Sequence, residues 1–168
     1  MKELLIRAER CLGCRSCELA CAVEHSAAKS LLLSINEKTR PQYRVHVTSD
    51  GKSSLPLQCR NCEDAPCLTA CLTGALHLDA RGVVLCNSDL CIGCWMCLMV
   101  CPFGIISQNN HERRIVKCDR CPEREIPACA TACPTAALTY REINQESQNK
   151  RQAVLGQIAT IHKSTIKL

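Results

Sequence analysis

The chain has 168 residues, about the length of one domain. It contains 17 cysteines but only one Trp, two Tyr and one Phe, which excludes a conventional core rich in aromatic side chains. The formal charge of +5 comes with no aromatic stacking platform and no basic stripe, which excludes a nucleic-acid-binding protein.

The predicted elements are short and lie between the cysteines. In chain order, a strand is expected at 4–7 (LLIR) and a helix at Ser16–Glu24. A hairpin follows at 76–85 around Asp79 to Gly82, then a helix at Met96–Val100. The last β pieces are GIIS and RIVK within 104–117 and ALTY at 137–140. The short helices are expected to begin near the third and fourth cysteine of each group.

Two segments contain none of the grouped cysteines. The first, 22–58, includes the alternating sequence RPQYRVHV and the turn SDGKSS. The second is the tail after residue 140, in which Val154, Ile158 and Ile161 recur at i, i+4 and i+7 and predict an amphipathic helix. This helix would either pack on the protein's own body or dock on a partner.

The cysteines form four groups of four, here called quartets. They are Cys11, Cys14, Cys17, Cys21; Cys59, Cys62, Cys67, Cys71; Cys91, Cys94, Cys97, Cys101; and Cys118, Cys121, Cys129, Cys133. The first and third have gaps of two, two and three residues, whereas the second and fourth have a wider middle gap. Cys86 stands alone and is interpreted as a small buried residue. The chain therefore repeats one motif four times.

Disulfide bonds and a membrane span explain these cysteines poorly. Their number is odd, they are too crowded to pair well, and no apolar signal stretch precedes Cys11, which predicts a cytoplasmic location. The uncharged run at 90–106 has the length of a minimal membrane helix, but Gly93, Pro102 and Gly104 break it. We therefore expect a buried metal pocket and no direct membrane insertion.

The spacing favours iron–sulfur clusters over zinc. Zinc sites join two CxxC pairs, a shape that three cysteines in close succession do not suit, although a zinc-stabilised interaction module remains the alternative. The run C-x2-C-x2-C-x3-C-P is the bacterial ferredoxin pattern, in which the fourth cysteine binds the other cluster. The third quartet fits this pattern through Pro102. Quartets must then pair, and proximity favours the second with the third.

Bound clusters would reverse the net charge of the protein. Each oxidised [4Fe-4S] core with four thiolates carries about −2, so four clusters turn +5 into roughly −3. The basic residues close to the quartets are interpreted as charge compensation. They are Arg10, Arg15, Arg60, Arg113, Arg114, Lys117 and Arg120.

The pattern from Cys11 to Cys133 resembles the four-cluster electron-transfer subunits of molybdopterin oxidoreductases, hydrogenases and formate hydrogenlyase. It is most similar to the iron–sulfur electron-transfer subunit of anaerobic carbon monoxide dehydrogenase. The segments that carry this resemblance are ERCLGCRSCELACAVEHS, LPLQCRNCEDAPC, GVVLCNSDLCIGC and KCDRCPEREIPAC.

The resemblance implies an α+β fold of two ferredoxin-like dicluster modules, one inserted in the other. The outer module is 1–21 with 118–143, the inner module is 59–117, and 22–58 and 144–168 are an insertion and a helical tail. Four [4Fe-4S] clusters are implied, with these ligand sets: Cys11, Cys14, Cys17, Cys133; Cys21, Cys118, Cys121, Cys129; Cys59, Cys62, Cys67, Cys101; and Cys71, Cys91, Cys94, Cys97.

The resemblance also implies a carrier of electrons without its own substrate chemistry. The implied donor is the carbon monoxide dehydrogenase catalytic subunit, and the acceptor is a hydrogenase or a flavin-dependent NAD(P) oxidoreductase. The alternative partner is a formate dehydrogenase, formate hydrogenlyase or another molybdopterin oxidoreductase. No Ser-His-Asp set, GxGxxG motif or P-loop is present in the sequence, so we expect no catalytic residues.

Overall fold

The computed structural model describes residues 2–109 and 111–165 and consists of short strands and helices. The strands are β1 (Lys2–Ile6), β2 (Val45–Ser49), β3 (Ser54–Gln58), β4 (Leu76–Leu78), β5 (Val84–Cys86), β6 (Ser107–Asn109), β7 (Arg114–Val116) and β8 (Leu138–Glu142). The helices are η1 (Ala8–Arg10), α1 (Ser16–Glu24), α2 (Leu31–Ser34), α3 (Pro66–Thr69), α4 (Met96–Val100), α5 (Ala128–Thr131) and α6 (Ile143–Thr165). The predicted α+β class is confirmed.

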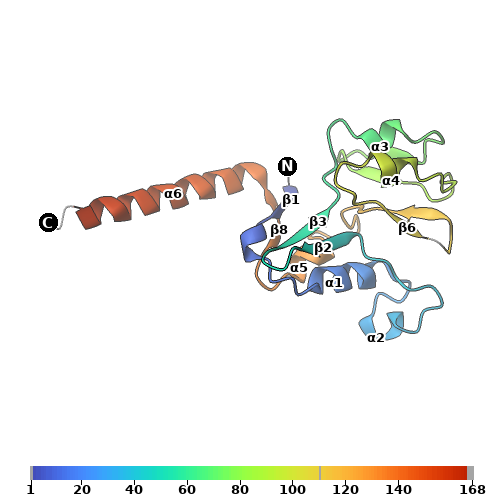
Figure 1. Cartoon of the computed structure of the whole chain (residues 1–168), viewed down its shortest axis with the longest axis horizontal. Helices are drawn as coiled ribbons and strands as arrows, with labels where there is room; N and C mark the ends of the chain where they lie inside the picture. The colour runs from blue at the N-terminus through green and yellow to red at the C-terminus, as the bar shows by residue number, and fades with distance from the viewer. Residues whose placement is uncertain (1, 110, 166–168) are drawn as a thin grey trace.

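The strands form antiparallel pairs rather than one continuous sheet. The pairs are β1–β8, β2–β3, β4–β5 and β6–β7. In β1–β8 the register sets Leu4 opposite Tyr140 and Ile6 opposite Leu138, so the two ends of the cysteine-bearing region lie side by side. Figure 1 shows this pair close to the start of α6, with the middle of the sequence forming a separate lobe around α3 and α4.

Two small apolar cores correspond to these two regions. The first contains Leu4, Val45, Val47 and Leu138 together with Cys17, Cys21 and Cys129. The second contains Ala65, Leu76, Val84 and Ile106 together with Cys97. Because cysteines complete both cores, the positions of the metal sites and of the apolar side chains are set together.

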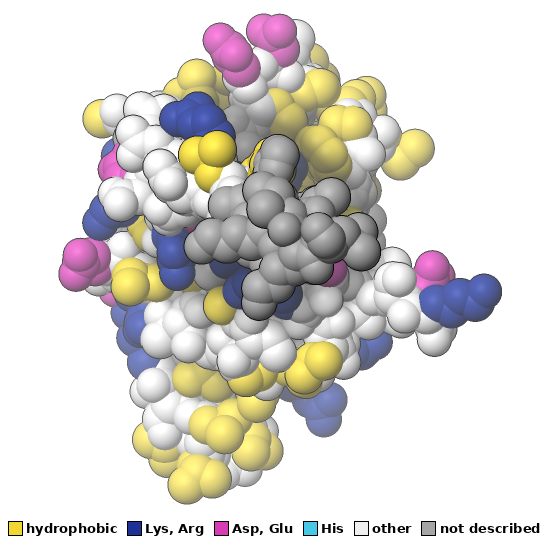
Figure 2. All heavy atoms as spheres, turned by 90° about the vertical axis from the view of Figure 1, so that its left-hand side faces the viewer, with side chains coloured by type: hydrophobic (Ala, Val, Ile, Leu, Met, Phe, Trp, Pro, Cys, Tyr) yellow, Lys and Arg dark blue, Asp and Glu magenta, His cyan; other side chains and the backbone are white. Residues whose placement is uncertain are grey.

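The span 22–58 is partly built into the first core. Its hairpin β2–β3 forms through the turn predicted at SDGKSS, and Val45 and Val47 of β2 are buried against α1 and β1. The preceding helix α2 instead exposes Leu32, Leu33 and Ile35. Figure 2 shows hydrophobic side chains gathered at the lower end of the molecule, where Figure 1 draws α2.

The predicted tail helix forms as α6, but it leaves the body (Figure 1). Glu146 anchors its first turn through an ion pair with Arg7 of the body. Further along, Val154 and Ile158 remain 52% and 51% exposed, and the side chain of Ile161 lies outside the described residues. Among the side chains described, packing of the apolar stripe on the body is therefore not observed.

No helix among the described residues is both long enough and apolar enough to cross a membrane. Within the uncharged run 90–106, only the five residues of α4 are helical.

Candidate metal centres

The four quartets share one local conformation. In every quartet the third cysteine is the second residue of a helix, so the helix start directs it inward. These residues are Cys17 in α1, Cys67 in α3, Cys97 in α4 and Cys129 in α5. The prediction for the fourth cysteine was wrong in three quartets: Cys71, Cys101 and Cys133 follow the helix end, and only Cys21 lies within a helix. These helices are too short to contain a further turn.

The residue before each second cysteine has a positive φ. The four residues are Gly13 (68°), Asn61 (46°), Gly93 (66°) and Arg120 (59°). A positive φ reverses the direction of the backbone, so that consecutive cysteines of a loop converge on one side. The repeated conformation therefore arises in two quartets from glycine and in two from residues that must tolerate the strain.

One hollow is lined by Cys11, Cys14, Cys17 and Cys133. Three of these thiols come from the first quartet and the fourth from a residue more than a hundred positions later. The side chains of Val47, Pro56 and Leu138 complete the wall. Cys14 is exposed, whereas Cys17 is buried, and burial raises the pKa of the Cys17 thiol to about 11.

A second hollow is lined by Cys59, Cys62, Cys67 and Cys101. Here three thiols come from the second quartet and one from the third. Ala65, Val84 and Ile106 from the second core line the same space. Burial raises the pKa of Cys67, while the nearby Lys117 ammonium opposes that rise.

Cys21, Cys118, Cys121 and Cys129 form a third group, and all four are buried. The pKa of Cys129 is raised by burial and then by its neighbours Cys118, Cys21 and Cys121. The backbone N–H of Arg44 donates to Cys21 Sγ at 3.2 Å, so the span 22–58 contributes directly to this group.

The remaining group is Cys71, Cys91, Cys94 and Cys97. Burial raises the pKa of Cys97 to about 11, and its neighbours include Cys94 and Cys71. Cys91 is placed in the same neighbourhood, because it interacts with Cys86, which also lies near Cys97 and Cys71. Cys94 is exposed, as Cys14 is in the first hollow.

Cys71 and Cys133 have matching hydrogen-bond partners. The N–H groups of Leu76 and Leu138 donate to their sulfurs, each at 3.4 Å, and Thr73 and Thr135 lie at 3.8 Å through their hydroxyl groups. Burial alone would raise the pKa of both thiols, but these bonds lower it below the usual value. Both sites therefore favour the thiolate form that a metal requires.

Cys86 has a different setting. It pairs with Leu76 in the β4–β5 hairpin and packs against the second core. Burial raises its pKa to about 12, with the adjacent Cys91 contributing to the rise, so the thiol stays neutral at neutral pH. The placement agrees with its interpretation as a packing residue.

The two thiol-lined hollows suit a cubane better than a zinc ion. A tetrahedral zinc site draws four sulfurs around one ion and leaves no hollow between them, whereas a cubane occupies such a space. In both hollows one thiol comes from a distant quartet, as the ferredoxin pattern requires. The residues therefore fit the iron–sulfur group.

One polar network near Cys21 and Cys121 was not anticipated from the sequence. Asp119 accepts an ion pair from Arg44 and lies 3.2 Å from His25 Nε2. Burial would raise the pKa of this carboxyl, but His25 and Arg44 together hold it well below its usual range. The sequence signal was Asp119 itself, a charged residue between two cysteines, but its partners come from 22–58.

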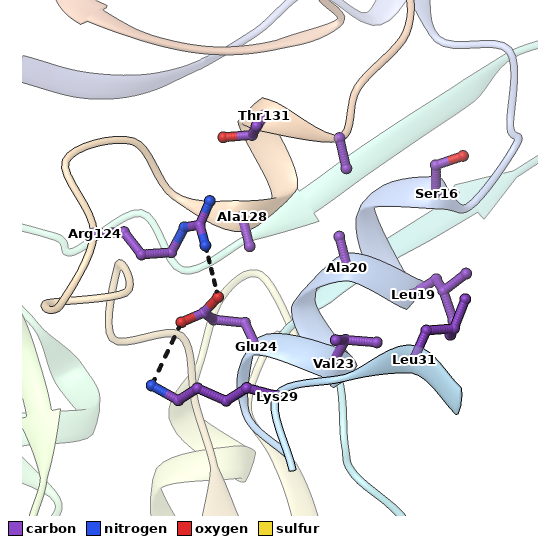
Figure 3. A pocket seen from close by; sticks show the side chains of 11 residues that line it. Ser16, Leu19, Ala20, Val23, Glu24, Lys29, Leu31, Arg124, Ala128 and Thr131 are labelled. Atoms are coloured by element: carbon purple, nitrogen blue, oxygen red, sulfur yellow. Dashed lines mark hydrogen bonds and ion pairs between the residues drawn. The ribbon is translucent and has the colours of Figure 1, made fainter. Parts of the chain in front are cut away.

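The largest hollow, about 460 Å³, contains no cysteine. It lies between α1, α2 and α5, and its walls include Leu19, Val23 and Leu31. Figure 3 shows the Glu24 carboxylate between Arg124 and Lys29 at one side of it. Because these charges are already paired, the groove offers apolar contact area rather than a set of reactive groups.

Comparison with known proteins gives one family and several relatives. Residues 52–143 match the family model described as the 4Fe-4S dicluster domain. An iron-sulfur protein of Rhodospirillum rubrum is 39% identical over 171 residues, covering 92% of this sequence and 90% of its own length. The electron transport protein HydN of Escherichia coli K12 is 35% identical, covering 86% and 90%. The B subunit of the anaerobic dimethyl sulfoxide reductase of Haemophilus influenzae is 33% identical, covering 82% and 72%.

Proposed function

Because this protein belongs to the 4Fe-4S dicluster family of iron–sulfur electron-transfer proteins, which carry multiple [4Fe-4S] clusters, we propose that it binds four of them and serves as an electron-carrying subunit of an oxidoreductase complex. The observation that carries this proposal is the pair of hollows, each lined by three cysteines of one quartet and one of another. Each bound cluster supplies a one-electron couple.

The proposed ligand sets are the four groups described above. The pairing of β1 with β8 and the existence of two cores support the proposed nested arrangement, with 1–21 and 118–143 outside and 59–117 inside. The burial of Val45 and Val47 supports assigning the hairpin of 22–58 to the outer module. The segment 144–168 is proposed as a separate helical tail.

Contacts between the groups support a linear order for the clusters. Cys17 of the first hollow neighbours Cys129 of the third group. Cys118 of the third group neighbours Cys59 of the second hollow. Within the inner module, Cys67 neighbours Cys97. Residues of the protein would thus position four clusters in a row that crosses both modules.

The two ends of this row are the groups with an exposed cysteine. Cys14 belongs to one end and Cys94 to the other, whereas the inner groups contain no exposed thiol. Electron transfer between proteins needs a short distance to the partner, so exposed ligands mark the ports for donor and acceptor. We assign electron entry and exit to these two ends, without assigning which is which.

For the partners, we propose a carbon monoxide dehydrogenase catalytic subunit as donor and a hydrogenase or flavin-dependent NAD(P) oxidoreductase as acceptor. The flanks of the first quartet, notably CELACAVEHS, support this choice. The donor reaction is CO + H2O → CO2 + 2 H+ + 2 e−, and the two electrons would enter one at a time. The similarity to the dimethyl sulfoxide reductase subunit favours the second candidate, a molybdopterin oxidoreductase as partner.

Reduction by purified donors distinguishes the two candidates. Under anoxic conditions, CO with a catalytic amount of carbon monoxide dehydrogenase should bleach the visible iron–sulfur absorbance of this protein, and formate with formate dehydrogenase should not. Omission of the substrate, CO or formate, is the control for each enzyme. Faster bleaching by formate than by CO would overturn the first choice of donor and favour the second candidate.

A further inference from the structure

Lys117 is a buried cation at the junction of the two modules. It follows β7 of the inner module and precedes Cys118 of the outer one, and it is 5% exposed. Its Nζ donates to the carbonyl oxygen of Val84 at 2.5 Å and to that of Cys118 at 3.1 Å. The ammonium is therefore fixed in place by backbone from both modules.

No carboxylate among the described residues lies within ion-pair distance of Lys117. Other basic residues near the quartets differ in this respect. Arg120 forms an ion pair with Glu3, and Arg44 forms one with Asp119. A buried charge without a counter-charge is costly, because carbonyl oxygens compensate it only in part. The position therefore requires an anion.

The anion that fits is an iron–sulfur cluster. Lys117 lines the hollow formed by Cys59, Cys62, Cys67 and Cys101, and it also influences Cys118 of the neighbouring group. A [4Fe-4S] core with four thiolates carries about −2 when oxidised and more negative charge after it accepts an electron. Attraction to a fixed cation grows with that added charge and is strong in a poorly polarisable interior.

We propose that Lys117 raises the reduction potential of the cluster held by Cys59, Cys62, Cys67 and Cys101, and so makes the middle of the row a resting place for electrons. This inference rests on the proposed function. Lys117 acts on the potential through its charge and touches no substrate. Its effect is on where electrons reside between arrivals, rather than on entry or exit.

Charge-removing and charge-keeping variants of Lys117 test the proposal. Potentiometric titrations followed by EPR should be recorded on fully loaded wild-type protein, Lys117→Gln and Lys117→Arg. In Lys117→Gln we expect one cluster to shift so that its reduced-to-oxidised ratio at the wild-type midpoint falls at least tenfold, which is 59 mV for a one-electron couple. Lys117→Arg should stay near the wild-type value. Lys52→Gln, which removes an exposed charge, is the matched control and should shift nothing.

Each other outcome has a defined meaning. Unchanged potentials in Lys117→Gln, or equal shifts in Lys117→Gln and Lys117→Arg, would overturn the role of the charge. If Lys117→Gln alone loses that cluster, the need for a cation is supported, whereas loss in both variants assigns the residue to packing and overturns the proposal. Fewer than four redox-active clusters in the wild-type protein would instead overturn the proposed function.

Discussion

Substitution of Cys97 by alanine should remove iron from the protein. Cys97 is buried at the start of α4, and its thiol has no role in the fold other than packing unless it binds a metal. Without it, the fourth group retains only three of its thiols, so we expect loss of between one and about four irons per molecule, from a total of about sixteen. Iron and sulfide analysis with EPR measures this, and a three-iron signal would mark partial loss.

Cys86→Ala is the matched control for this experiment. Cys86 lies beside Cys91 and Cys97 and is also partly buried, but it belongs to no quartet. This variant should keep the wild-type iron content and lose only a little packing. Iron loss in Cys86→Ala together with full iron in Cys97→Ala would exchange their roles and contradict the proposed ligand set.

Substitution of Gly93 by alanine should strongly destabilise the inner module. Gly93 has a φ of +66°, and an added Cβ would lie 2.2 Å from the carbonyl oxygen of Arg113, which is backbone. The left-handed conformation alone costs an alanine about 1–2 kcal/mol. Because the loop must also move away from Arg113, we expect a total above about 3 kcal/mol, or roughly 6–12 °C in the thermal loss of iron–sulfur absorbance.

Gly74→Ala separates backbone strain from the clash. Gly74 has nearly the same φ, +67°, but an added Cβ would meet no atom within 4 Å. This variant should therefore lose only the cost of the left-handed conformation. If Gly93→Ala and Gly74→Ala lose stability to the same extent, the close approach of Arg113 does not matter and the explanation is wrong.

The local structure followed closely from the cysteine spacing. The helices at Ser16–Glu24 and Met96–Val100 form with the bounds expected from the sequence, and the hairpin turns at Asp79 to Gly82 as predicted. This accuracy has a physical reason. Gaps of two and three residues leave the backbone few conformations that gather thiols on one side, so the same turn and helix start recur in each quartet.

The parts that the sequence did not predict depend on contacts between distant segments. The network of Arg44, His25 and Asp119 and the burial of Val45 arise only when 22–58 folds back on the outer quartets. Periodicity likewise predicted the helix α6 but could not say that it leaves the body, because an apolar stripe fits an intramolecular or an intermolecular surface equally well. Side-chain pairing over long separations has no local signature.

An anomalous difference map at the iron edge, from crystals grown without oxygen, tests the central claim most directly. The account predicts four compact iron peaks in a row, each surrounded by three thiols of one quartet and one of its partner quartet. The peak between Cys59, Cys62, Cys67 and Cys101 should lie beside the Lys117 ammonium. Fewer than four iron peaks, or single zinc ions between CxxC pairs, would contradict it.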